Sequence, residues 1–397
     1  MSLLPAMLAN DFWTSNSCHV AVNPHRAADS HDLKRWAEGQ GLSALCFFQT
    51  SGSENTPKWV ALSKQAFLIS ARAVNGHFGI KASDRWLIAL PLHHVGGFAI
   101  LARAHLSGSS VVHDVSRWQP LAFANLCERE KITLVSLVPT QVHDLVRDHV
   151  PCPESVRAVI VGGGSLPREM AEGAGVLGWR IYQSYGMTEA ASQIATQTCN
   201  GAATLDALEV LPHWKTHVDD RGCLVLSGDS LAKGYAIRDK TGNWTWHEIG
   251  GELVTRDAVR LWDHGTKRLL QFIGRESGFV KIMGELVHLA PLQARLDSLI
   301  FKNGFVSNPV IVAVSDARSE NRLVLVSEDS FGESIMAAFN DRTERLCHLT
   351  EVIHVRRIPR SPLGKVSAEA LRALIAQTAT PAARQTPSPP ALAAPVQ

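Results

Sequence analysis

The chain has 397 residues, of which 45% are hydrophobic and 19% are charged, and its formal net charge at pH 7 is +2. This length exceeds one ordinary hydrophobic core and predicts two or more domains in a globular protein. The near-balanced charge and the lack of a long Lys/Arg cluster argue against a nucleic-acid partner. No apolar run reaches the length of about 18 residues that a membrane-spanning helix needs.

The seven cysteines are scattered, odd in number and free of Cys-x-x-Cys spacing. They argue against a zinc site or a disulfide framework and favour reduced thiols in a cytoplasmic protein. The segment 1–10 lacks a basic stretch and contains Pro5, so we expect no secretory signal.

A hydroxyl-rich loop follows the first strongly apolar run. After a short helix at 32–39, residues 45–48 predict a buried strand. The stretch after it contains Thr50, Ser51, Gly52, Ser53 and Lys58. Such a loop offers backbone N–H groups, hydroxyls and an ammonium group, which together suit a polyphosphate. A polar hairpin with a solvated lysine is the alternative, and the stretch alone leaves both open.

A second candidate site lies where the next strand ends. Residues 64–74 predict a helix with Ser63 as its N-cap, and residues 86–90 predict a short strand that ends at Pro91. The segment that follows contains His93 and His94 before two glycines. Strand ends carry ligands in α/β folds, although a pair of turn histidines without a function is the alternative.

Alternating elements continue as a strand at 109–112, helices at 121–130 and 141–147, and strands at 132–138 and 156–161. The last of these strands ends in Gly162, Gly163 and Gly164. Three glycines let a flat ring approach the backbone closely, whereas the alternative is a flexible loop.

The next strand, at 179–183, leads into the most specific short motif, residues 184–189. Tyr185 can stack on a purine and Thr188 can bond a phosphate. Glu189 can hold Mg²⁺, because hard cations prefer oxygen ligands. Alternating strands and helices up to this point predict a parallel sheet flanked by helices.

The pattern then changes. Short strands between Gly/Asp turns at 206–263 predict a β-rich subdomain, and residues 279–375 predict a compact α+β domain. Within the latter we expect a helix at 289–299, strands at 309–314 and 322–326, a helix from 334 to about 350, and a strand at 352–356. Residues 376–397 are rich in Ala, Pro, Thr and Ser and predict a disordered tail.

Taken in order, these motifs resemble those of the adenylate-forming superfamily, which includes acyl-CoA synthetases, adenylation domains and luciferases. The resemblance covers roughly residues 44–375. It implies Mg²⁺ on Glu189 and catalytic roles for His94, Thr188 and Lys365. Residues implied to bind the nucleotide or the thiol substrate are Thr50, Ser51, Gly52, Ser53, Lys58, Gly162, Gly163, Gly164, Tyr185, Gly186, Asp257, Arg275, Lys281 and Gly284.

The chain departs from the family pattern at a few positions. Glu54 and Asn55 stand where the phosphate loop usually has Thr and Gly, and His93 replaces the usual aromatic residue. Arg256 replaces a glycine beside Asp257, which could also be a simple turn residue. Gly278 replaces the hinge aspartate, and glycine absorbs large φ/ψ changes readily.

The resemblance implies an α/β fold with a large N-terminal domain of helix-flanked sheets and a β-rich subdomain, followed by a small mobile α+β domain. The expected domains are 1–277, 278–375 with the catalytic lysine, and the tail 376–397.

The implied reaction has two halves: a carboxylate attacks the α-phosphorus of ATP, and the thiol of coenzyme A then displaces AMP. Size and segment order resemble most the 2-succinylbenzoate–CoA ligases of menaquinone synthesis. Another aryl- or acyl-CoA ligase, or a nucleotide-binding homologue without catalysis, is the alternative. The expected partners are a small carboxylic acid, ATP, Mg²⁺ and coenzyme A, and a homodimer is compatible with this assignment.

Overall fold

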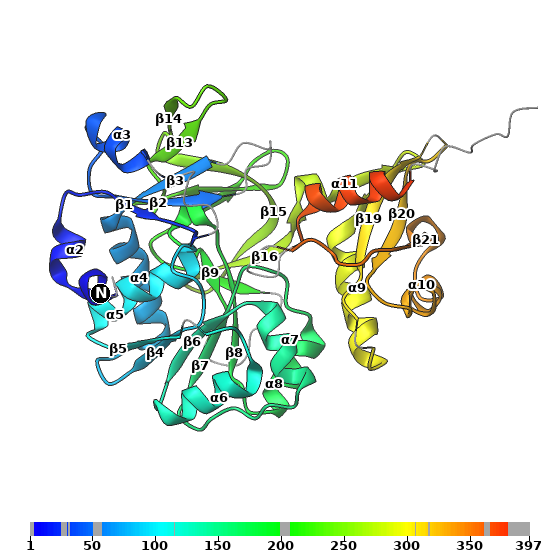
Figure 1. The fold of residues 1–397 in the computed structure, drawn as a ribbon, viewed down its shortest axis with the longest axis horizontal. Helices are drawn as coiled ribbons and strands as arrows, with labels where there is room; N and C mark the ends of the chain where they lie inside the picture. The colour runs from blue at the N-terminus through cyan, green and yellow to red at the C-terminus, as the bar shows by residue number, and fades with distance from the viewer. Residues whose placement is uncertain are drawn as a thin grey trace, which may run out of the picture.

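The computed structural model describes residues 4–24, 30, 32–50, 58–114, 116–198, 207–305, 307–316, 318–360 and 366–379. Figure 1 shows a larger lobe that holds the elements up to β16 and a smaller lobe that holds β19 to β21 with helices α9 to α11. Among these residues no helix is both long enough and apolar enough to cross a membrane.

A parallel sheet forms the lower part of the large lobe in Figure 1. Its strands are β4 (Arg85–Ile88), β5 (Ser110–His113), β6 (Leu134–Leu137), β7 (Ala158–Val161) and β8 (Ile181–Tyr185). The connecting helices are α5 (Val95–Ser107), α6 (Pro120–Arg129), α7 (Pro139–Arg147) and α8 (Arg168–Val176). The predicted helix-flanked parallel sheet is therefore confirmed, and β6 and β7 are buried throughout, as strands covered on both faces must be.

The same sheet continues beyond β8 as antiparallel strands and reaches eleven strands in all. The added strands are β9 (Ala195–Thr196), β10 (Leu208–Val210), β11 (Lys215–Val218), β12 (Cys223–Ser227), β15 (Glu252–His264) and β16 (Lys267–Arg275). Most strands of the β-rich subdomain predicted after residue 206 thus share a sheet with the parallel strands.

A second, five-stranded sheet is built from two distant parts of the chain. Its strands, in spatial order, are β1 (His19–Ala21), β2 (Leu45–Thr50), β3 (Lys58–Ser63), β13 (Gly234–Arg238) and β14 (Trp244–Glu248). Strands β2 and β3 pair antiparallel, with Thr50 opposite Lys58. Helix α4 (Lys64–Phe78) follows β3, and the Ser63 side chain accepts a hydrogen bond from Ala66 N, which confirms the predicted N-cap.

Short helices cover the start of the large lobe: α1 (Leu4–Leu8), α2 (Asn10–Thr14) and α3 (Leu33–Gly39). Beneath α4 and α5, the rings of Phe48, Phe67 and Phe98 meet with centroids 5.1–5.6 Å apart. They come from β2, α4 and α5 and belong to one hydrophobic cluster that also includes residues of the parallel sheet. This shared core fixes the two sheets relative to each other.

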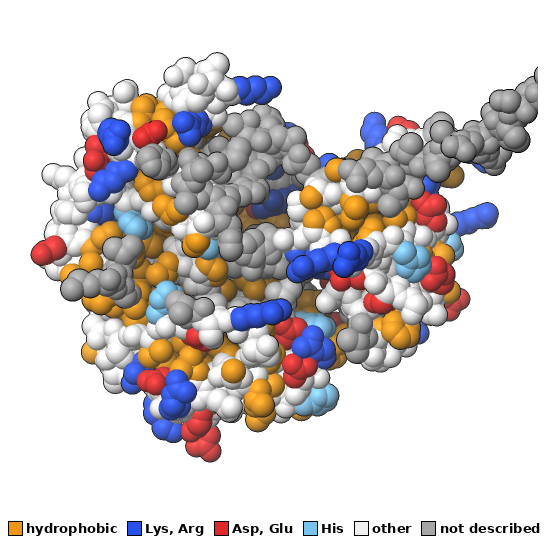
Figure 2. All heavy atoms as spheres, in the orientation of Figure 1, with side chains coloured by type: hydrophobic (Ala, Val, Ile, Leu, Met, Phe, Trp, Pro, Cys, Tyr) orange, Lys and Arg blue, Asp and Glu red, His pale blue; other side chains and the backbone are white. Residues whose placement is uncertain are grey.

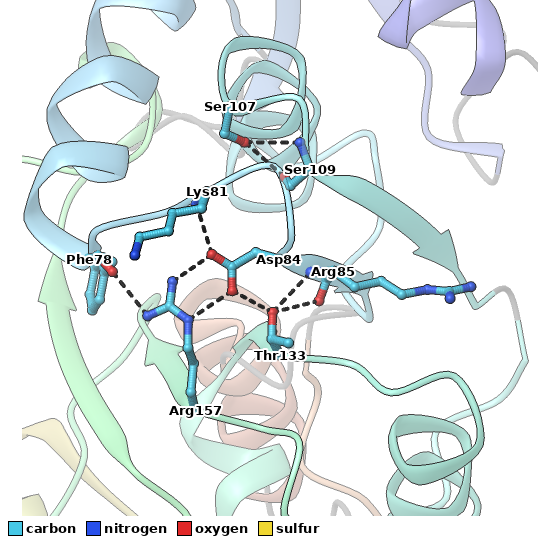
Figure 3. A network of polar contacts seen from close by, with 8 residues as sticks. All are labelled: Phe78, Lys81, Asp84, Arg85, Ser107, Ser109, Thr133 and Arg157. Atoms are coloured by element: carbon cyan, nitrogen blue, oxygen red, sulfur yellow. Dashed lines mark hydrogen bonds and ion pairs between the residues drawn. The ribbon is translucent and has the colours of Figure 1, made fainter.

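A polar network around the buried Asp84 ties together the amino ends of three parallel strands (Figure 3). The Arg157 guanidinium donates to both oxygens of Asp84 at 2.8 Å and to the carbonyl of Phe78 at 3.0 Å. Thr133 donates to Asp84 at 2.8 Å, and Lys81 N donates at 2.9 Å. Because these residues precede β4, β6 and β7, the network lies at the opposite edge of the sheet from the carboxyl ends.

The small lobe begins with the hairpin β17 (Phe279–Ile282) and β18 (Glu285–His288) and helix α9 (Leu289–Lys302). Its main sheet consists of β19 (Val310–Asp316), β20 (Glu320–Ser327) and β21 (Leu349–His354). Helices α10 (Gly332–Asn340) and α11 (Ala368–Ala379) complete it.

One predicted helix of the small lobe was wrong in its length. Helix α10 ends at Asn340, and residues 349–354 form a strand instead of the helix expected to continue to about 350. The Asn340 side chain donates to Leu349 O and accepts from Leu349 N, at 2.9 and 2.8 Å. The Asn340 side chain thus ends the helix, because it bonds to the backbone of Leu349 at the start of β21 and offers the chain an alternative to further helical hydrogen bonds.

The last helix extends into the segment that was predicted as a tail. Helix α11 includes residues 376–379, and its Leu371 and Ile375, spaced by one turn, are buried against the small lobe. Residues 380–397 lie outside the described part of the chain.

The two lobes meet where α8 packs against α9 (Figure 1). Glu169 accepts hydrogen bonds from Ser298 Oγ at 2.8 Å and from Lys302 Nζ at 3.0 Å. A groove of about 650 Å³ lies beside this contact, and its cationic lining residues are Arg168, Arg295, Lys302 and Arg342. Figure 2 shows Lys and Arg side chains gathered at the junction of the lobes.

Candidate functional site

Side chains from two strands converge on Glu189, which lies in the short helical turn η2 (Thr188–Ala190) after β8. Lys58 Nζ, at the start of β3, lies 3.4 Å from Glu189 Oε1. The Tyr235 hydroxyl, from β13, donates to the same oxygen at 3.2 Å. Lys58 Nζ also lies 4.0 Å from the centre of the Tyr235 ring. We call Lys58, Glu189 and Tyr235 the carboxylate cluster.

The carboxylate cluster defines the surroundings of Lys58, for which a solvated position in a polar hairpin was the alternative. Strands β2 and β3 do form a hairpin, but Lys58 is not a freely solvated lysine, because it pairs with Glu189 and stacks on Tyr235. Burial and the Glu189 charge raise the pKa of the Tyr235 hydroxyl above its usual value, which keeps it a hydrogen-bond donor.

The cluster fits one kind of metal site. No group of three or more His, Cys, Asp or Glu side chains among the described residues could hold a metal by itself. Glu189 therefore supplies a single protein carboxylate. That suits Mg²⁺, which takes one or two carboxylates and completes its shell with phosphate oxygens and water.

A second group of side chains surrounds Asp257 in the middle of β15. The Tyr185 hydroxyl, at the end of β8, donates to Asp257 Oδ2 at 2.7 Å. Arg275 Nε, at the end of β16 and directly across the strand pair, donates to Asp257 Oδ1 at 3.1 Å. The rings of Tyr185 and Phe272 stack with centroids 5.6 Å apart. We call Tyr185, Asp257, Phe272 and Arg275 the aspartate cluster.

The aspartate cluster holds a buried carboxylate in a fixed orientation. Asp257 is buried, and each of its oxygens has one protein donor and keeps one free lone pair. Burial first, and then the Asp257 charge, raise the pKa of the Tyr185 phenol well above its usual value. Asp257 can thus still accept two hydroxyl groups from a ligand.

The triple-glycine loop lies beside Tyr185, at the end of β7. A Cβ atom on Gly162 would lie 2.9 Å from Ser184 Oγ, so a side chain here would displace that hydroxyl group. Gly186, directly after Tyr185, is much more restricted, because a Cβ atom there would overlap the backbone carbonyl of Ser192. The chain thus packs closely at the ends of β7 and β8. Gly163 and Gly164 belong to the same loop, and Thr188 lies next to Glu189.

The two histidines lie at the start of α5. His94 is the residue before the helix, and its ring centroid lies 4.5 Å from that of His93. The flanking Leu92 and Val95 pack against the same hydrophobic cluster as Tyr185. The structure thus joins the histidine turn and the aspartate cluster through one core.

Other predicted site residues lie away from the two clusters or outside the described part of the chain. Thr50 ends β2, and its hydroxyl donates to Lys58 O at 3.4 Å. Lys281 and Gly284 lie on the β17–β18 hairpin and contact Asn321 and Glu320 of the small lobe. Predicted residues outside the described part of the chain are Ser51, Gly52, Ser53 and Lys365, as well as the departures Glu54 and Asn55.

Sequence reasoning missed Tyr235 and Phe272. Both join the site only through strand pairing between distant segments, which no local motif reveals. One compositional signal was available, because the chain has only three tyrosines. Two of these, Tyr185 and Tyr235, donate hydrogen bonds to the two site carboxylates.

Residues 23–236 match the family model of the AMP-binding enzymes. The match spans more than half of the 397 residues. The chain belongs to the AMP-binding enzyme family. The α/β fold expected from the family resemblance is confirmed.

Curated members of the AMP-binding family resemble this chain over much of its length. A 2-succinylbenzoate–CoA ligase of Bacillus subtilis (strain 168) is 28% identical over 285 residues, which are 68% of this chain and 56% of that protein. A 2-succinylbenzoate–CoA ligase of Bacillus velezensis is 26% identical over 89% of this chain and 73% of that protein. The chain thus aligns with little more than half of the Bacillus subtilis relative.

Solved structures of AMP-binding proteins share the fold. O-succinylbenzoate coenzyme A synthetase (MenE) of Bacillus subtilis, in complex with ATP and a magnesium ion, has a TM-score of 0.69 and 25% identity. That match covers 82% of this chain and 69% of the other. Wild-type Escherichia coli MenE, with a bound analogue of OSB-AMS, has a TM-score of 0.59 and 27% identity over 84% of this chain and 70% of the other.

Proposed function

We propose that this protein is an AMP-forming acid–thiol ligase that converts a carboxylic acid first to an acyl-adenylate and then to a coenzyme A thioester. The observation that carries the proposal is the pair of held carboxylates. Glu189, in the turn after β8, pairs with Lys58 of β3, and Asp257 of β15 pairs with Arg275 of β16. One suits the metal-bound phosphates of ATP and the other suits a ribose.

In the first half-reaction the acid's carboxylate oxygen forms a bond to the α-phosphorus, the bond to the β-phosphate breaks, and pyrophosphate leaves. Asp257 and Arg275 hold the ribose, and Tyr185 with the loop Gly162–Gly164 forms the adenine wall. Lys58 and the loop from Thr50 hold the departing phosphates, and Thr188 bonds a phosphate oxygen. Positioning and charge neutralisation dominate such a step. A Mg²⁺ ion held by Glu189 would neutralise phosphate charge.

In the second half-reaction the thiol sulfur attacks the acyl carbon, the bond to AMP breaks, and the thiol proton is released. We propose that the domain boundary lies at residues 277–278, with Gly278 as the hinge. Rotation there moves Lys365, which faces the α-phosphate in the first half, away from the site. Gly284 and Lys281 of the β17–β18 hairpin then border the thiol channel. The small domain must change position between the two half-reactions, because a site closed around ATP cannot also admit the long arm of coenzyme A.

We propose 2-succinylbenzoate as the acid, which places the reaction in menaquinone synthesis. Support comes from the names of the curated relatives and from the ATP- and magnesium-bound relative of known structure. His94, at the start of α5, is the residue we propose to contact the acid. Another aryl or acyl acid is the second candidate.

We further propose a cytoplasmic location, because the described cysteines Cys18, Cys46, Cys127, Cys152, Cys223 and Cys347 are all free thiols. A homodimer stays a prediction, which light scattering of the purified protein would check.

The test is pyrophosphate release from ATP and Mg²⁺ with 2-succinylbenzoate, benzoate and medium-chain fatty acids, each with and without coenzyme A. Release with 2-succinylbenzoate and formation of its thioester is the expected result. Pyrophosphate release only with another acid would show that this other acid is the substrate. No release with any acid, while ATP still binds, would favour a non-catalytic nucleotide-binding protein. Lys365→Ala should abolish adenylate formation while ATP still binds, and Lys240→Ala, in an exposed turn, is the control.

A further inference from the structure

Helix α5 carries a charged side chain in the interior of the large lobe. Arg103 is only 2% exposed. No Asp or Glu among the described residues lies within ion-pair distance of its guanidinium group, which stands 5.7 Å from the centre of the Trp86 ring. Burial lowers the Arg103 pKa to about 10, so the group stays charged at neutral pH. A buried charge without a countercharge is unfavourable, so its presence needs a reason.

The side-chain hydrogen bond of Arg103 goes to the loop that carries the carboxylate cluster. Its Nη2 donates to Gln193 Oε1 at 2.9 Å. Gln193 lies in the connection between β8 and β9, four residues after Glu189. The contact therefore ties the middle of α5 to the segment that carries the proposed magnesium ligand.

The backbone of this connection between β8 and β9 adopts an unfavourable conformation. Ala191 and Ser192 have φ angles of 47° and 98°, in the left-handed region that side chains disfavour. Gly186 packs directly against the Ser192 carbonyl. Such a conformation persists only where surrounding contacts enforce it.

Four contacts from separate parts of the large lobe enforce it. Ser70 Oγ donates to Ala191 O at 3.3 Å, and Ala232 N donates to Glu189 O at 2.8 Å. Trp214 Nε1 donates to Gln193 O at 3.1 Å, and the Arg103 bond to the Gln193 side chain is the fourth. Only the Arg103 contact involves a charge, and charge-assisted bonds are shorter and stronger than neutral ones.

We propose that Arg103 is a positioning residue for magnesium–nucleotide binding, which fixes Gln193 and through it the strained turn that aims the Glu189 carboxylate. This inference rests on the proposed function, because it takes Glu189 as the magnesium ligand. Arg103 itself touches none of the reacting groups.

The hydrogen bonding of Arg103 and Gln193 allows a positioning role to be distinguished from a role in fold stability. Arg103 Nε and Gln193 Nε2 are buried and have no acceptor among the described residues. A buried polar pair with such orphan donors is a poor stabiliser, and apolar residues of similar volume often replace it without loss of stability. Replacing both residues should therefore leave stability nearly unchanged and still weaken magnesium-dependent binding.

The experiment measures ATP affinity with and without Mg²⁺ by calorimetry, together with thermal unfolding, in full-length variants. The variants are Arg103→Met, Gln193→Met, their double variant and Arg103→Lys. We expect the affinity gained on adding Mg²⁺ to fall roughly 10- to 100-fold in Arg103→Met, the range found when partners of metal ligands are removed. ATP affinity without Mg²⁺ should hold, and Arg103→Lys should restore part of the gain.

Asn75→Leu is the matched control. Asn75 Nδ2 donates to Arg103 O at 2.9 Å, so this variant perturbs the same helix packing without touching the loop. It should lower the unfolding temperature and leave the magnesium-dependent gain intact. Equal losses with and without Mg²⁺, or losses that follow the unfolding temperature in all variants, would overturn the positioning role alone. A wild-type protein without any magnesium-dependent gain would overturn this role and the proposed function together.

Discussion

At the scale of single residues, the two site carboxylates are held in different ways. Asp257 lies between two fixed donors, Tyr185 and Arg275, whereas Glu189 shares one oxygen between Lys58 and Tyr235. Fixed donors prepare a carboxylate to accept hydroxyl groups, because its orientation costs nothing when the ligand arrives. Glu189 instead keeps its other oxygen free of these two partners, and we propose that this oxygen binds the magnesium ion.

The first prediction concerns ribose binding. Asp257→Asn should weaken AMP binding about 10- to 100-fold, because hydrogen bonds to a charged acceptor contribute about 1.5–3 kcal/mol. Wild-type protein should prefer AMP over 2′-deoxy-AMP, and the variant should bind both alike. Asp263→Asn is the control, since Asp263 lies on the same strand but pairs with Arg268 at the surface. Retained preference for AMP in the Asp257 variant would remove the ribose role.

The second prediction concerns the network at the amino ends of the strands. Burial alone would raise the pKa of Asp84, but hydrogen bonds from Arg157, Lys81 N and Thr133 outweigh it and hold the pKa below its usual value. Asp84 therefore stabilises the fold above its unfolded pKa of about 3.9, and this contribution is lost as pH falls through the lowered folded pKa.

Asp84→Asn should lower the free energy of unfolding by about 2 kcal/mol at pH 7, a value kept modest because the Arg157 side chain is 34% exposed. Urea titrations at pH 7 and pH 3 would check this. The difference between variant and wild type should narrow at pH 3. A constant difference at both pH values would mean that the Asp84 charge is not its source.

At the scale of elements, α5 shows how close packing sets the position of a site residue. The helix is buried from Gly97 to Ala104, so it has no polar face. At its start, a Cβ atom on Gly97 would lie 2.5 Å from Pro91 O and 2.7 Å from Leu90 O. Only glycine lets the helix begin directly beneath the turn that carries His94.

The third prediction tests this contact. Gly97→Ala should destabilise the protein by about 1–3 kcal/mol, the usual cost of overpacking, because backbone atoms cannot move aside cheaply. It should also raise KM for the acid more than KM for ATP, since the His94 turn shifts. Gly96→Ala is a close control, because its Cβ atom would meet only Leu90 Cδ1 at 3.6 Å. Since alanine favours a helix more than glycine does, propensity alone would stabilise both variants. Similar losses in both variants would therefore show that the contact of residue 97 with Pro91 and Leu90 is not the cause.

The same helix shows why part of the fold was missed from the sequence. Alternation of strands and helices predicted the parallel sheet, but α5 and α8 were not predicted. Helix α5 is buried on nearly all sides, and even its Arg103 lies inside, so no alternation of apolar and polar residues reveals it. The predicted extension of α10 was wrong because Asn340 bonds to Leu349, a contact that no propensity describes.

The candidate site divides in a similar way. Tyr185, Glu189, Asp257 and Arg275 were predicted because each lies in a local motif, and the structure brings them into two neighbouring clusters. Tyr235 and Phe272 were missed because strand pairing alone brings them to the site. The predicted loop residues Ser51 to Ser53 and Lys365 lie outside the described chain and stay predictions.

At the scale of the whole molecule, the lobes are joined by the chain at 276–278 and by the contact of α8 with α9. Glu169 is the acidic residue of that contact and offsets one of the cations around the groove, Lys302. Without it, like charges on both lobes would face each other and favour separation.

The fourth prediction follows from this contact. Glu169→Ala should shift the balance between docked and undocked lobes by about fivefold towards the undocked state, because partly exposed ion pairs contribute up to about 1 kcal/mol. Single-molecule fluorescence transfer between labels on the two lobes would measure the balance. Glu172→Ala is the control, since Glu172 pairs with Arg168 within α8. An unchanged distribution, or an equal shift in the control, would show that Glu169 does not hold the lobes.

The interleaving of the two large sheets sets an order of events while the ribosome makes the chain. Strand β3 is complete at residue 63, but its neighbour β13 begins only at residue 234. At translation rates of about 5–20 residues per second, β3 waits roughly 10–30 s for that partner. Throughout this delay Trp59 and Ala61, fully buried in the finished protein, lie on an open strand edge. Open apolar edges invite pairing with other chains, so β3 is a segment where nascent copies are exposed to aggregation.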